Sequence, residues 1–438
     1  MCIPTCFKVF AIAALSGSYA CAARALESQL SEIAPAYAAT SVNTAIFRAN
    51  PLATFGGTQY ACFYAPDGYV VLARRAVDGG SWEVSRTPYR GNVDDAHNVV
   101  CMGIDGEGYL HLAFDHHGHP LRYCRSTAPE SLEMGPLESM TGLPGEDNVT
   151  YPEFHTLPDG NMLFVFRNGA SGRGDMVMNR YDCASRTWHR VHDVLIDGEG
   201  RRNAYWQTCV DSRGTLHVSW VWRESWLVET NHDVCYARSR DGGATWERSD
   251  GTPCGLPITI ASAETVVRVG QGHELINQCS MAADEHGRPI IAMYWRDDAD
   301  SIPHYRVLEH DGARWHCEVV VDRHTPFSLS GGGTKMIPIS RPRIVAGDDG
   351  AAYMLFRDAE RGSRVSMASR TARGEAWTVT DLTDFSVDAW EPSVDIDLWR
   401  KCGRLDVYVQ RASQGDGERA TDAPPSPACV LSLHFPKK

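Results

Sequence analysis

Two histidines, a tyrosine and an arginine stand at the ends of strand-like runs that flank two successive turns. His97 and His117 lie on either side of the turn at 105–108, while Tyr151 and Arg167 each lie eight residues from Asp159 in the next turn. In an antiparallel hairpin, residues that flank the turn symmetrically return to the same end of the sheet. The spacing therefore predicts that all four side chains meet at one rim of the protein.

These residue types suit the removal of a proton next to a carboxylate. An arginine can neutralise the carboxylate and stabilise the charge that develops on it. A neutral histidine or an ionised tyrosine can take the proton, and a neighbouring histidine or tyrosine can protonate the leaving oxygen. The chemistry is β-elimination on a uronic acid residue of a polysaccharide. Glycoside hydrolysis usually uses two carboxylic acids, and the equivalent sequence positions offer no such pair.

Strand-turn-strand units recur along the whole chain. They are Tyr60–Arg75, His97–His117, Tyr151–Arg167, Ala204–Arg223, Asn277–Arg296, Pro342–Arg357 and Val394–Arg411. Their spacing of about forty to seventy residues leaves room for two further strands in each unit. The pattern predicts an all-β fold, a seven-bladed β-propeller of four-stranded antiparallel blades.

Other segments complete this organisation. We expect one propeller domain over residues 24–438, with a short helix at Leu26–Ala38 before the ring and no amphipathic helix within it. Gln414–Pro427 has the composition of a loop, and Val430–Phe435 is expected to be the closing strand. Ser239–Trp246 matches the Asp-box pattern S-x-D-x-G-x-T-W, in which the turn joins outer strands and the tryptophan packs between blades. This motif is structural and does not imply sialidase activity.

A basic residue ends the second strand of each unit. The set is Arg75, His117, Arg167, Arg223, Arg296, Arg357 and Arg411. Guanidinium groups arranged in a ring would suit a carboxylate or a sulfate. We assign Arg75, Arg296, Arg357 and Arg411 to ties between blades instead. His111 and His217 recur at one interior strand position, which indicates packing and hydrogen bonding.

Composition limits the partners and the compartment. A net charge of −13 disfavours binding to nucleic acid or to an acidic membrane. Residues 1–23 resemble an export signal, with a lipid anchor at Cys21 as the alternative, and no other stretch is long enough to span a membrane. We expect an exported bacterial protein, periplasmic or secreted, that acts as a monomer. The eleven cysteines beyond this segment are expected to be mostly buried small hydrophobes.

Several motifs resemble those of the BNR-4 group of seven-bladed propellers, which includes the ulvan lyases of polysaccharide lyase families 24 and 25. The motifs are Asp95–Asn98, Pro120–Tyr123, Thr150–Phe154, Phe166–Asp175, Ala204–Trp206, Ser219–Glu224 and Ser340–Arg343. The resemblance runs from Val42 to about Arg357 and includes both the two-histidine spacing and the Tyr-to-Arg spacing.

The resemblance implies a role for each matched residue. His97 and Tyr151 would transfer protons, Arg167 would neutralise the uronate, and His117 would assist or orient. Substrate binding would fall to Arg223, Asn98, His116 and Tyr205, and the repeated histidine at 116 and 117 leaves open which of the two belongs to the site. Catalysis would need no cofactor. A structural divalent ion, zinc or calcium, stays open, with His232 and Cys235 as candidate zinc ligands.

These observations predict a polysaccharide lyase that acts on an anionic polymer containing uronic acid. An ulvan-like polymer of rhamnose and uronate is the leading candidate. One alternative is an exo-acting α-L-rhamnosidase that releases rhamnose from glucuronate. The other is a propeller that binds glycans without cleaving them.

Overall fold

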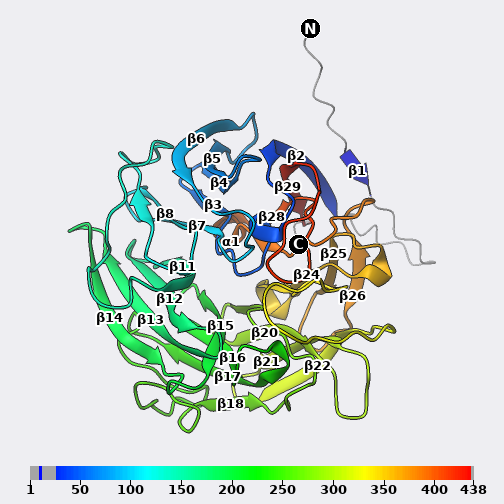
Figure 1. Cartoon of the computed structure of the whole chain (residues 1–438). Coiled ribbons are helices and arrows are strands. Elements are labelled where there is room, and N and C mark those ends of the chain that lie inside the picture. The colour runs from blue at the N-terminus through cyan, green and yellow to red at the C-terminus, as the bar shows by residue number, and fades with distance from the viewer. Residues whose placement is uncertain (1–8, 12–25, 436–438) are drawn as a thin grey trace.

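Antiparallel sheets stand in a ring around a central axis, each with one strand towards the axis and one at the perimeter (Figure 1). The computed structural model describes residues 9–11 and 26–435. Within these residues the single α-helix is α1 (Ile396–Cys402). The predicted all-β propeller is therefore confirmed, while the number of seven blades stays a prediction.

Strands that follow one another in the sequence pair with one another in the sheets. One sheet contains β3 (Leu52–Phe55), β4 (Thr58–Tyr64), β5 (Tyr69–Ala76) and β6 (Glu83–Arg90). A three-stranded sheet contains β7 (Val100–Ile104), β8 (Leu110–Phe114) and β10 (Tyr123–Arg125). Two further four-stranded sheets contain β19 (Ser280–Ala283), β20 (Pro289–Trp295), β21 (His304–His310) and β22 (Trp315–Val321), and β23 (Arg343–Ala346), β24 (Ala352–Phe356), β25 (Ser366–Arg370) and β26 (Thr378–Asp381).

The largest sheet joins two successive antiparallel units. The first consists of β11 (Val149–Thr156), β12 (Met162–Ala170), β13 (Arg173–Asp182) and β14 (Thr187–Ile196). The second consists of β15 (Asn203–Val210), β16 (Leu216–Arg223), β17 (Asn231–Ser239) and β18 (Glu264–Val267). The short strand β9 (His117–His119) pairs with β11, so that His117 lies opposite Thr150. This pairing links the first predicted hairpin to the second at the rim.

The two ends of the described chain meet in one sheet. β2 (Glu27–Ala36) pairs antiparallel with β29 (Ser426–His434), which continues into β28 (Arg404–Val409) and β27 (Ser393–Val394); the two end strands lie side by side in Figure 1. β1 (Val9–Ala11) pairs with the outer side of β2. The predicted helix at 26–38 is therefore wrong, because β29 offers this segment a full ladder of backbone partners. The expected closing strand is confirmed and begins four residues earlier.

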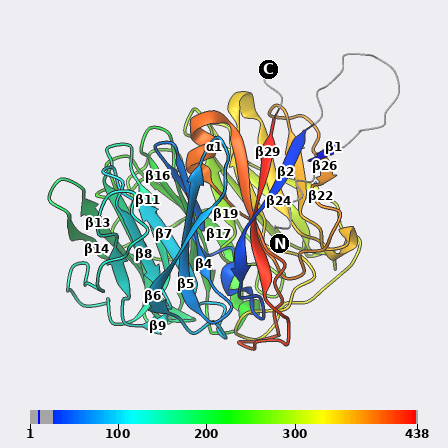
Figure 2. The same cartoon turned by 90° about the horizontal axis from the view of Figure 1, so that it is seen from above.

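The helix α1 corrects a second expectation, that no helix interrupts the ring. It stands between β27 and β28, inside the predicted strand-turn-strand unit Val394–Arg411. Asp395 caps its start by accepting a hydrogen bond from the Leu398 N–H at 3.0 Å, and Gly403 ends it in the left-handed conformation. Seven residues are too few to show a helical period in the sequence. In Figure 2, α1 and β9 lie at opposite ends of the ring.

Aspartates shape the turns of the inner hairpins. Asp105 accepts a hydrogen bond from the Tyr109 N–H at 2.9 Å, and its other oxygen lies 3.3 Å from His111 Nε2. Asp211 and His217 repeat this contact at 3.4 Å. Such side chain to backbone bonds are the reason that aspartate favours turns. Both histidines are fully buried, which confirms their assignment to packing and hydrogen bonding.

The Asp box forms the turn after β17, as predicted. Ser239 Oγ accepts a hydrogen bond from the Gly243 N–H at 2.9 Å, and Asp241 accepts one from the Thr245 N–H at 2.9 Å. Trp246 is buried in the main hydrophobic core, and its Nε1 donates to the Gly243 carbonyl at 3.0 Å. The motif therefore contributes to packing, as its assignment to a structural role predicts.

The placement of the cysteines agrees with the prediction that most of them are buried. The described cysteines are free thiols and most are buried.

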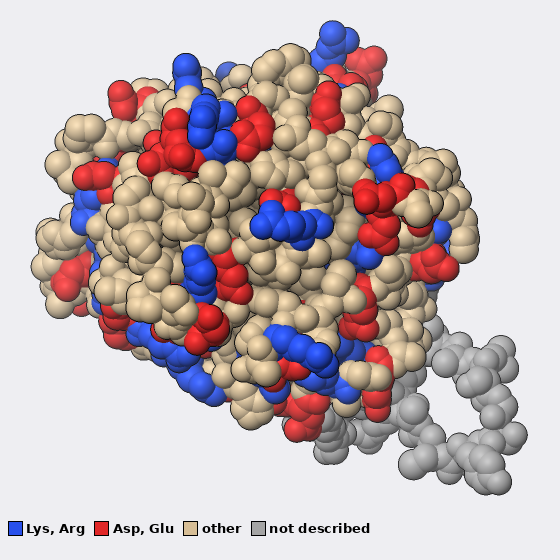
Figure 3. All heavy atoms as spheres, turned by 90° about the horizontal axis from the view of Figure 1, so that it is seen from below, with Lys and Arg blue, Asp and Glu red and all other residues tan. Residues whose placement is uncertain are grey.

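Acidic and basic side chains are interspersed over the face drawn in Figure 3, without a continuous patch of one sign. No helix within the described ranges has the length and apolar character needed to cross a bilayer. The predicted export segment 1–23 lies outside the described residues, apart from the three residues of β1.

Candidate active site

A cavity of about 560 Å³ opens at the end of the ring that carries β9. Six of the eight residues that the sequence analysis assigned to the site line it, namely His97, His117, Tyr151, Arg167, Tyr205 and Arg223. They come from the first two strands of two neighbouring units and from the loop and short strand before them. The predicted meeting of the two histidines, Tyr151 and Arg167 at one rim is therefore what the structure shows.

The two histidines share one carboxylate. Asp95 Oδ1 lies 3.0 Å from His97 Nδ1, and Asp95 Oδ2 lies 2.6 Å from His117 Nδ1. The imidazole rings stack with their centroids 4.0 Å apart and their planes 15° apart. Since both Nδ1 atoms contact the carboxylate, the Nε2 atom of each ring is left for proton transfer.

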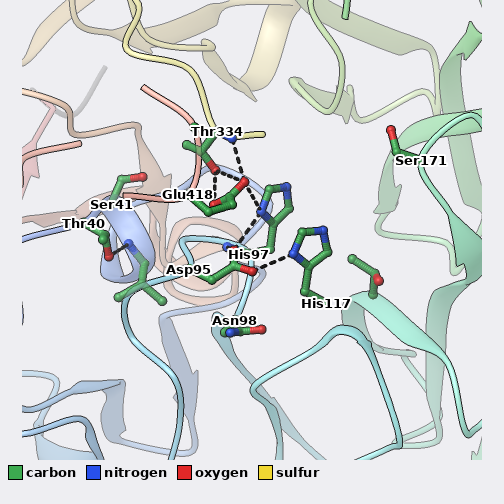
Figure 4. Close-up of polar contacts among 12 residues, drawn as sticks. Thr40, Ser41, Asp95, His97, Asn98, His117, Ser171, Thr334 and Glu418 are labelled. Atoms are coloured by element: carbon green, nitrogen blue, oxygen red, sulfur yellow. Dashed lines mark hydrogen bonds and ion pairs between the residues drawn. The ribbon is translucent and has the colours of Figure 1, made fainter. Parts of the chain in front are cut away.

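A second carboxylate reaches His97 from the C-terminal loop. Glu418 Oε1 lies 3.1 Å from His97 Nδ1 and also accepts a hydrogen bond from the Thr334 N–H at 2.8 Å. Figure 4 shows Glu418 and Asp95 both directed at His97, with His117 beside them. His97 is thus held between two carboxylates that come from segments more than 300 residues apart.

These contacts give the two histidines different charge states. Burial lowers the pKa of His97, but the hydrogen bonds and charges of Asp95 and Glu418 outweigh it and raise that pKa to about 9. Burial and the neighbouring His97 charge lower the pKa of His117, against the opposing effect of Asp95. Although burial opposes it, hydrogen bonding to the two rings holds the pKa of Asp95 well below its usual range. At neutral pH His97 is therefore a cation and His117 is neutral.

Tyr151 sits at a bulge in β11. Its φ of 56° is left-handed, and the pairing with β12 shifts register between Thr150 and Glu153. Bulges redirect a side chain, and a bulky residue in this conformation is strained. The Tyr151 ring lies 5.7 Å from the His97 ring and 4.9 Å from the Arg167 guanidinium. Burial and the neighbouring Tyr205 raise the pKa of Tyr151, so this phenol keeps its proton.

Two arginines converge on Tyr205. Arg167 Nη1 and Arg223 Nη1 donate to the Tyr205 hydroxyl at 3.4 and 3.2 Å, and Ser171 Oγ lies 2.7 Å from it. Burial raises the pKa of Tyr205, but the Arg223 and Arg167 charges outweigh it and lower that pKa below its ordinary value. Arg167 Nη2 also donates to Thr150 Oγ1 at 3.1 Å. The result is a fixed pair of guanidinium groups at the cavity wall.

Two residues assigned to substrate binding do not reach the cavity. Asn98 is fully buried and donates to the Asn92 carbonyl at 3.0 Å. His116 is also fully buried, and its Nε2 accepts a hydrogen bond from the Arg122 N–H at 2.8 Å. Neither lines the cavity. Alternation along the chain explains the second result, because adjacent residues point to opposite sides, and it places His117 rather than His116 at the site.

The basic residues at the strand ends fall into two groups. His117, Arg167, Arg223 and Arg357 line the cavity, and Arg75, Arg296 and Arg411 do not. Arg75 contacts Asp406 at 3.4 Å, and Arg411 contacts Asp388 at 2.6 Å. Arg357 donates to the carbonyls of Ile339 and Trp390 at 3.0 and 3.2 Å. Arg75 in β5 thus makes the predicted tie to a neighbouring sheet through Asp406 in β28, and Arg357 also faces the cavity.

One group of three side chains in the described residues is spaced closely enough to hold a metal ion. It is Asp95, His97 and His117, whose ligand atoms lie within 4.8 Å of one another. Both Asp95 oxygens already contact the histidine Nδ1 atoms, so the arrangement fits hydrogen bonding. His232 contacts Glu224 at 2.9 Å and Asp233 at 3.3 Å, and Cys235 belongs to no such group in the part of the chain described.

Sequence reasoning missed Asp95 and Glu418 as site residues. Asp95 lies two residues before His97, so a local signal existed in the segment that bears the histidine. Glu418 had no such signal, because its segment was predicted only as a loop and its contact with His97 depends on the path of that loop across the ring.

Comparison with known sequences places this geometry in a family context. The family described as "BNR repeat-containing family member" matches residues 58–323. The long isoform of ulvan lyase from Pseudoalteromonas sp. (strain PLSV) is 23% identical over 223 residues, which are 39% of this chain and 22% of that protein. The short isoform from Alteromonas sp. (strain LOR) is 23% identical over 227 residues, again 39% of this chain and 43% of that protein. The matched region thus spans less than half the length of either relative.

Solved structures show the same fold. A structure described as a polysaccharide lyase PL25 ulvan lyase has a TM-score of 0.67 and 17% identity, and covers 89% of this chain and 94% of that chain. The polysaccharide lyase Uly1 has a TM-score of 0.64 and 16% identity, and covers 89% of this chain and 90% of that chain. At these identities the likeness concerns the fold.

Proposed function

The chain belongs to the BNR repeat-containing family, and from this premise we propose that it is a polysaccharide lyase that cleaves an ulvan-like polymer of rhamnose and uronate by β-elimination. The observation that carries the proposal is the cavity in which a cationic His97, a neutral His117, a protonated Tyr151 and the guanidinium groups of Arg167 and Arg223 meet. This set supplies a base, an acid and a carboxylate partner without a flanking pair of free carboxylic acids.

The charge states suggest a role for each group. Arg167 and Arg223 neutralise the uronate carboxylate, which makes the C5 proton more acidic. Neutral His117 takes that proton through Nε2, the electron pair forms the C4–C5 double bond, and the C4–O bond breaks. His97, as a cation, protonates the leaving oxygen, with the Tyr151 phenol beside it as a second donor. The products are an unsaturated uronate end and a new hydroxyl end.

This scheme revises two expectations from the sequence. Tyr151 does not act as an ionised base, because burial keeps its phenol protonated. His117, expected to assist or orient, is the group that is neutral and free at Nε2. Asp95 then acts as a positioning residue that orients both rings through their Nδ1 atoms and fixes the tautomer of the neutral His117.

The comparisons support the choice of substrate. The similar curated proteins are ulvan lyases, and one PL25 ulvan lyase of the same fold was solved bound to -[GlcA(1-4)Rha3S]-. We extend this substrate class to the present chain as part of the proposal. Export of the chain and a single propeller domain over 24–438 belong to the same proposal.

The test is to incubate the purified protein with ulvan and with other uronic-acid polysaccharides and to follow unsaturated uronate by ultraviolet absorbance. We expect product from ulvan, and its loss in the variants His97→Ala and Tyr151→Phe while circular dichroism stays unchanged. Release of free rhamnose without unsaturated ends would instead identify a rhamnosidase. Binding of intact ulvan without any product would identify a glycan-binding propeller.

A further inference from the structure

The two most exposed large hydrophobic side chains of the described residues line the same cavity. Trp226 is 61% exposed and Met336 is 70% exposed. Phe385, by comparison, is 41% exposed and does not line the cavity. Exposed apolar groups rimmed by polar ones mark binding surfaces. Neither residue has a part in the proton transfers or in the neutralisation of the carboxylate.

The loop that carries Trp226 is held firmly. Trp226 lies between β16 and β17, where the Val228 N–H donates to the Gly331 carbonyl and the Gly331 N–H donates to Glu229, both at 2.9 Å. Gly332 packs directly on the indole, since a Cβ at this position would lie 2.6 and 2.9 Å from two ring carbons. The ring is therefore fixed from behind by a glycine that allows the close approach.

The loop that carries Met336 is fixed as well. Lys335 Nζ contacts Asp416 at 2.9 Å, and the Met336 N–H donates to the other oxygen of Asp416 at 3.3 Å. Lys335 and Asp416 are thus paired with each other, while the two apolar side chains are left uncovered. Because both loops are held in place by hydrogen bonds, binding costs little backbone conformational entropy.

A polymer bound by its uronate must leave the cavity across its rim. The C–H face of a pyranose ring is apolar, and a 6-deoxy sugar adds a methyl group in place of a hydroxymethyl. An indole and a thioether are suited to contact such a face. The rim therefore matches the alternation of an anionic sugar with a 6-deoxy sugar, because the cationic wall and the apolar rim lie in one cavity.

We propose that Trp226 and Met336 form a platform that binds the sugar residue next to the cleaved uronate, a 6-deoxy hexose that presents its methyl-bearing face. The platform deepens the proposed lyase function and rests on it. It acts on binding of substrate and transition state alike, so its loss raises KM and leaves kcat nearly unchanged.

The test compares Trp226→Ala, Trp226→Phe and the control Phe385→Ala on ulvan oligosaccharides of increasing length. We expect Trp226→Ala to lower kcat/KM about 10-fold on the longer oligosaccharides through KM, as expected for loss of one large apolar contact. Trp226→Phe recovers part of this loss, and Phe385→Ala behaves as the wild type. Equal kcat/KM for Trp226→Ala and wild type at every length would overturn the platform, as would an equal loss in the control.

A direct binding measurement separates this proposal from the lyase function. If the wild type forms no unsaturated product, calorimetric titration with the same ulvan oligosaccharides still tests the platform. Weaker binding to Trp226→Ala than to Phe385→Ala supports it, and equal affinity overturns it. A change of oligomeric state in Trp226→Ala on size-exclusion chromatography would assign the surface to self-association and also overturn the platform.

Discussion

At the scale of single residues, two adjacent histidines that share one carboxylate have different charge states. Asp95 contacts both rings, but only His97 has the second carboxylate, Glu418, at 3.1 Å. With two anions against it, His97 stays protonated, while burial and the His97 charge lower the pKa of the stacked His117 and keep it neutral. A pair of identical side chains can thus serve as acid and base at the same pH.

This difference predicts a bell-shaped dependence of kcat/KM on pH. The pKa of His117 is lowered below its ordinary 6.5, so its basic form is present above that pKa and activity falls as the pH drops through it. The pKa of His97 is raised to about 9, so its acidic form is lost as the pH rises through that value. Initial rates on ulvan across this range check both limbs. A rate still rising above pH 10 would exclude His97 as the acid.

The guanidinium of Arg167 predicts that a lysine is a poor replacement. Arg167 uses separate nitrogen atoms for Tyr205 and Thr150 and lies over the Tyr151 ring, and a point charge cannot reproduce this fork. We expect Arg167→Lys to lower kcat by about 100-fold with a smaller change in KM, since the carboxylate gains charge in the transition state. The control is Arg296→Lys, which lies outside the cavity. An effect confined to KM would make Arg167 a binding residue only.

At the scale of elements, two loops from different parts of the ring, residues 334–335 and 416–418, bind each other next to the site. We call this pair of loops the clasp. The Thr334 N–H donates to Glu418 at 2.8 Å, the Gly417 N–H donates to the Thr334 carbonyl at 2.8 Å, and Lys335 pairs with Asp416 at 2.9 Å. The clasp delivers Glu418 to His97. The loops therefore set the chemistry of a histidine that belongs to neither of them.

The clasp predicts that Glu418→Gln moves the upper limb of the pH profile to lower pH. Removing a charge 3.1 Å from His97 should lower the pKa of its imidazole by about one unit. Asp416→Asn is the matched control, because it weakens the clasp without touching His97. The upper limb is measured as kcat/KM against pH for both variants. An equal shift in both would assign the effect to loop position rather than to the charge of Glu418.

The same contact has a consequence for stability. Because the folded-state pKa of His97 is raised above its unfolded value, the contact contributes stability below pH 6.5, and the contribution is lost as the pH rises through about 9. Glu418→Gln should therefore lower Tm more at neutral pH than at pH 10, where only its contacts with Thr334 are still affected.

At the scale of the whole molecule, closure of the ring depends on a strand from the N-terminal part of the chain. β2 covers the edge of β29, and Ile33 and Ala36 in β2 are buried. Without β2 the last sheet would expose an unpaired edge and part of its core.

Closure of the ring by β2 predicts that two parts of the first 36 residues contribute unequally to thermal stability. Deletion of residues 1–36 removes β2 and should abolish the cooperative thermal transition or lower Tm strongly. Deletion of residues 1–23, the predicted export segment, retains all of β2 and should leave Tm nearly unchanged. Thermal unfolding followed by circular dichroism compares the two. Similar stability in both truncated proteins would show that β2 does not close the ring.

The positive charge concentrated at the cavity, despite the negative net charge of the chain, predicts that catalysis needs no added metal. The chain carries −13 net charge, yet Arg167 and Arg223 concentrate positive charge at the cavity, and the oxygens of Asp95 are engaged by the two histidines. Treatment with EDTA should leave the initial rate of unsaturated-product formation nearly unchanged while circular dichroism confirms the fold. Loss of activity with the fold intact, restored by calcium, would transfer the neutralising role from Arg167 to an ion.

The sequence by itself determined the hairpins, the ring and four of the side chains that meet in it. Period-2 alternation and Asp-Gly turns are local signals, and the equal spacing of His97 and His117, and of Tyr151 and Arg167, around their turns needs only strand geometry to be converted into proximity. The tertiary structure alone decided that 27–36 is a strand and that Glu418 reaches His97. Each of these depends on a partner far away in the chain: β29 for the strand and the path of the C-terminal loop for Glu418. No local pattern records such a partner, because the free energy that selects it comes from contacts made only when the ring is closed.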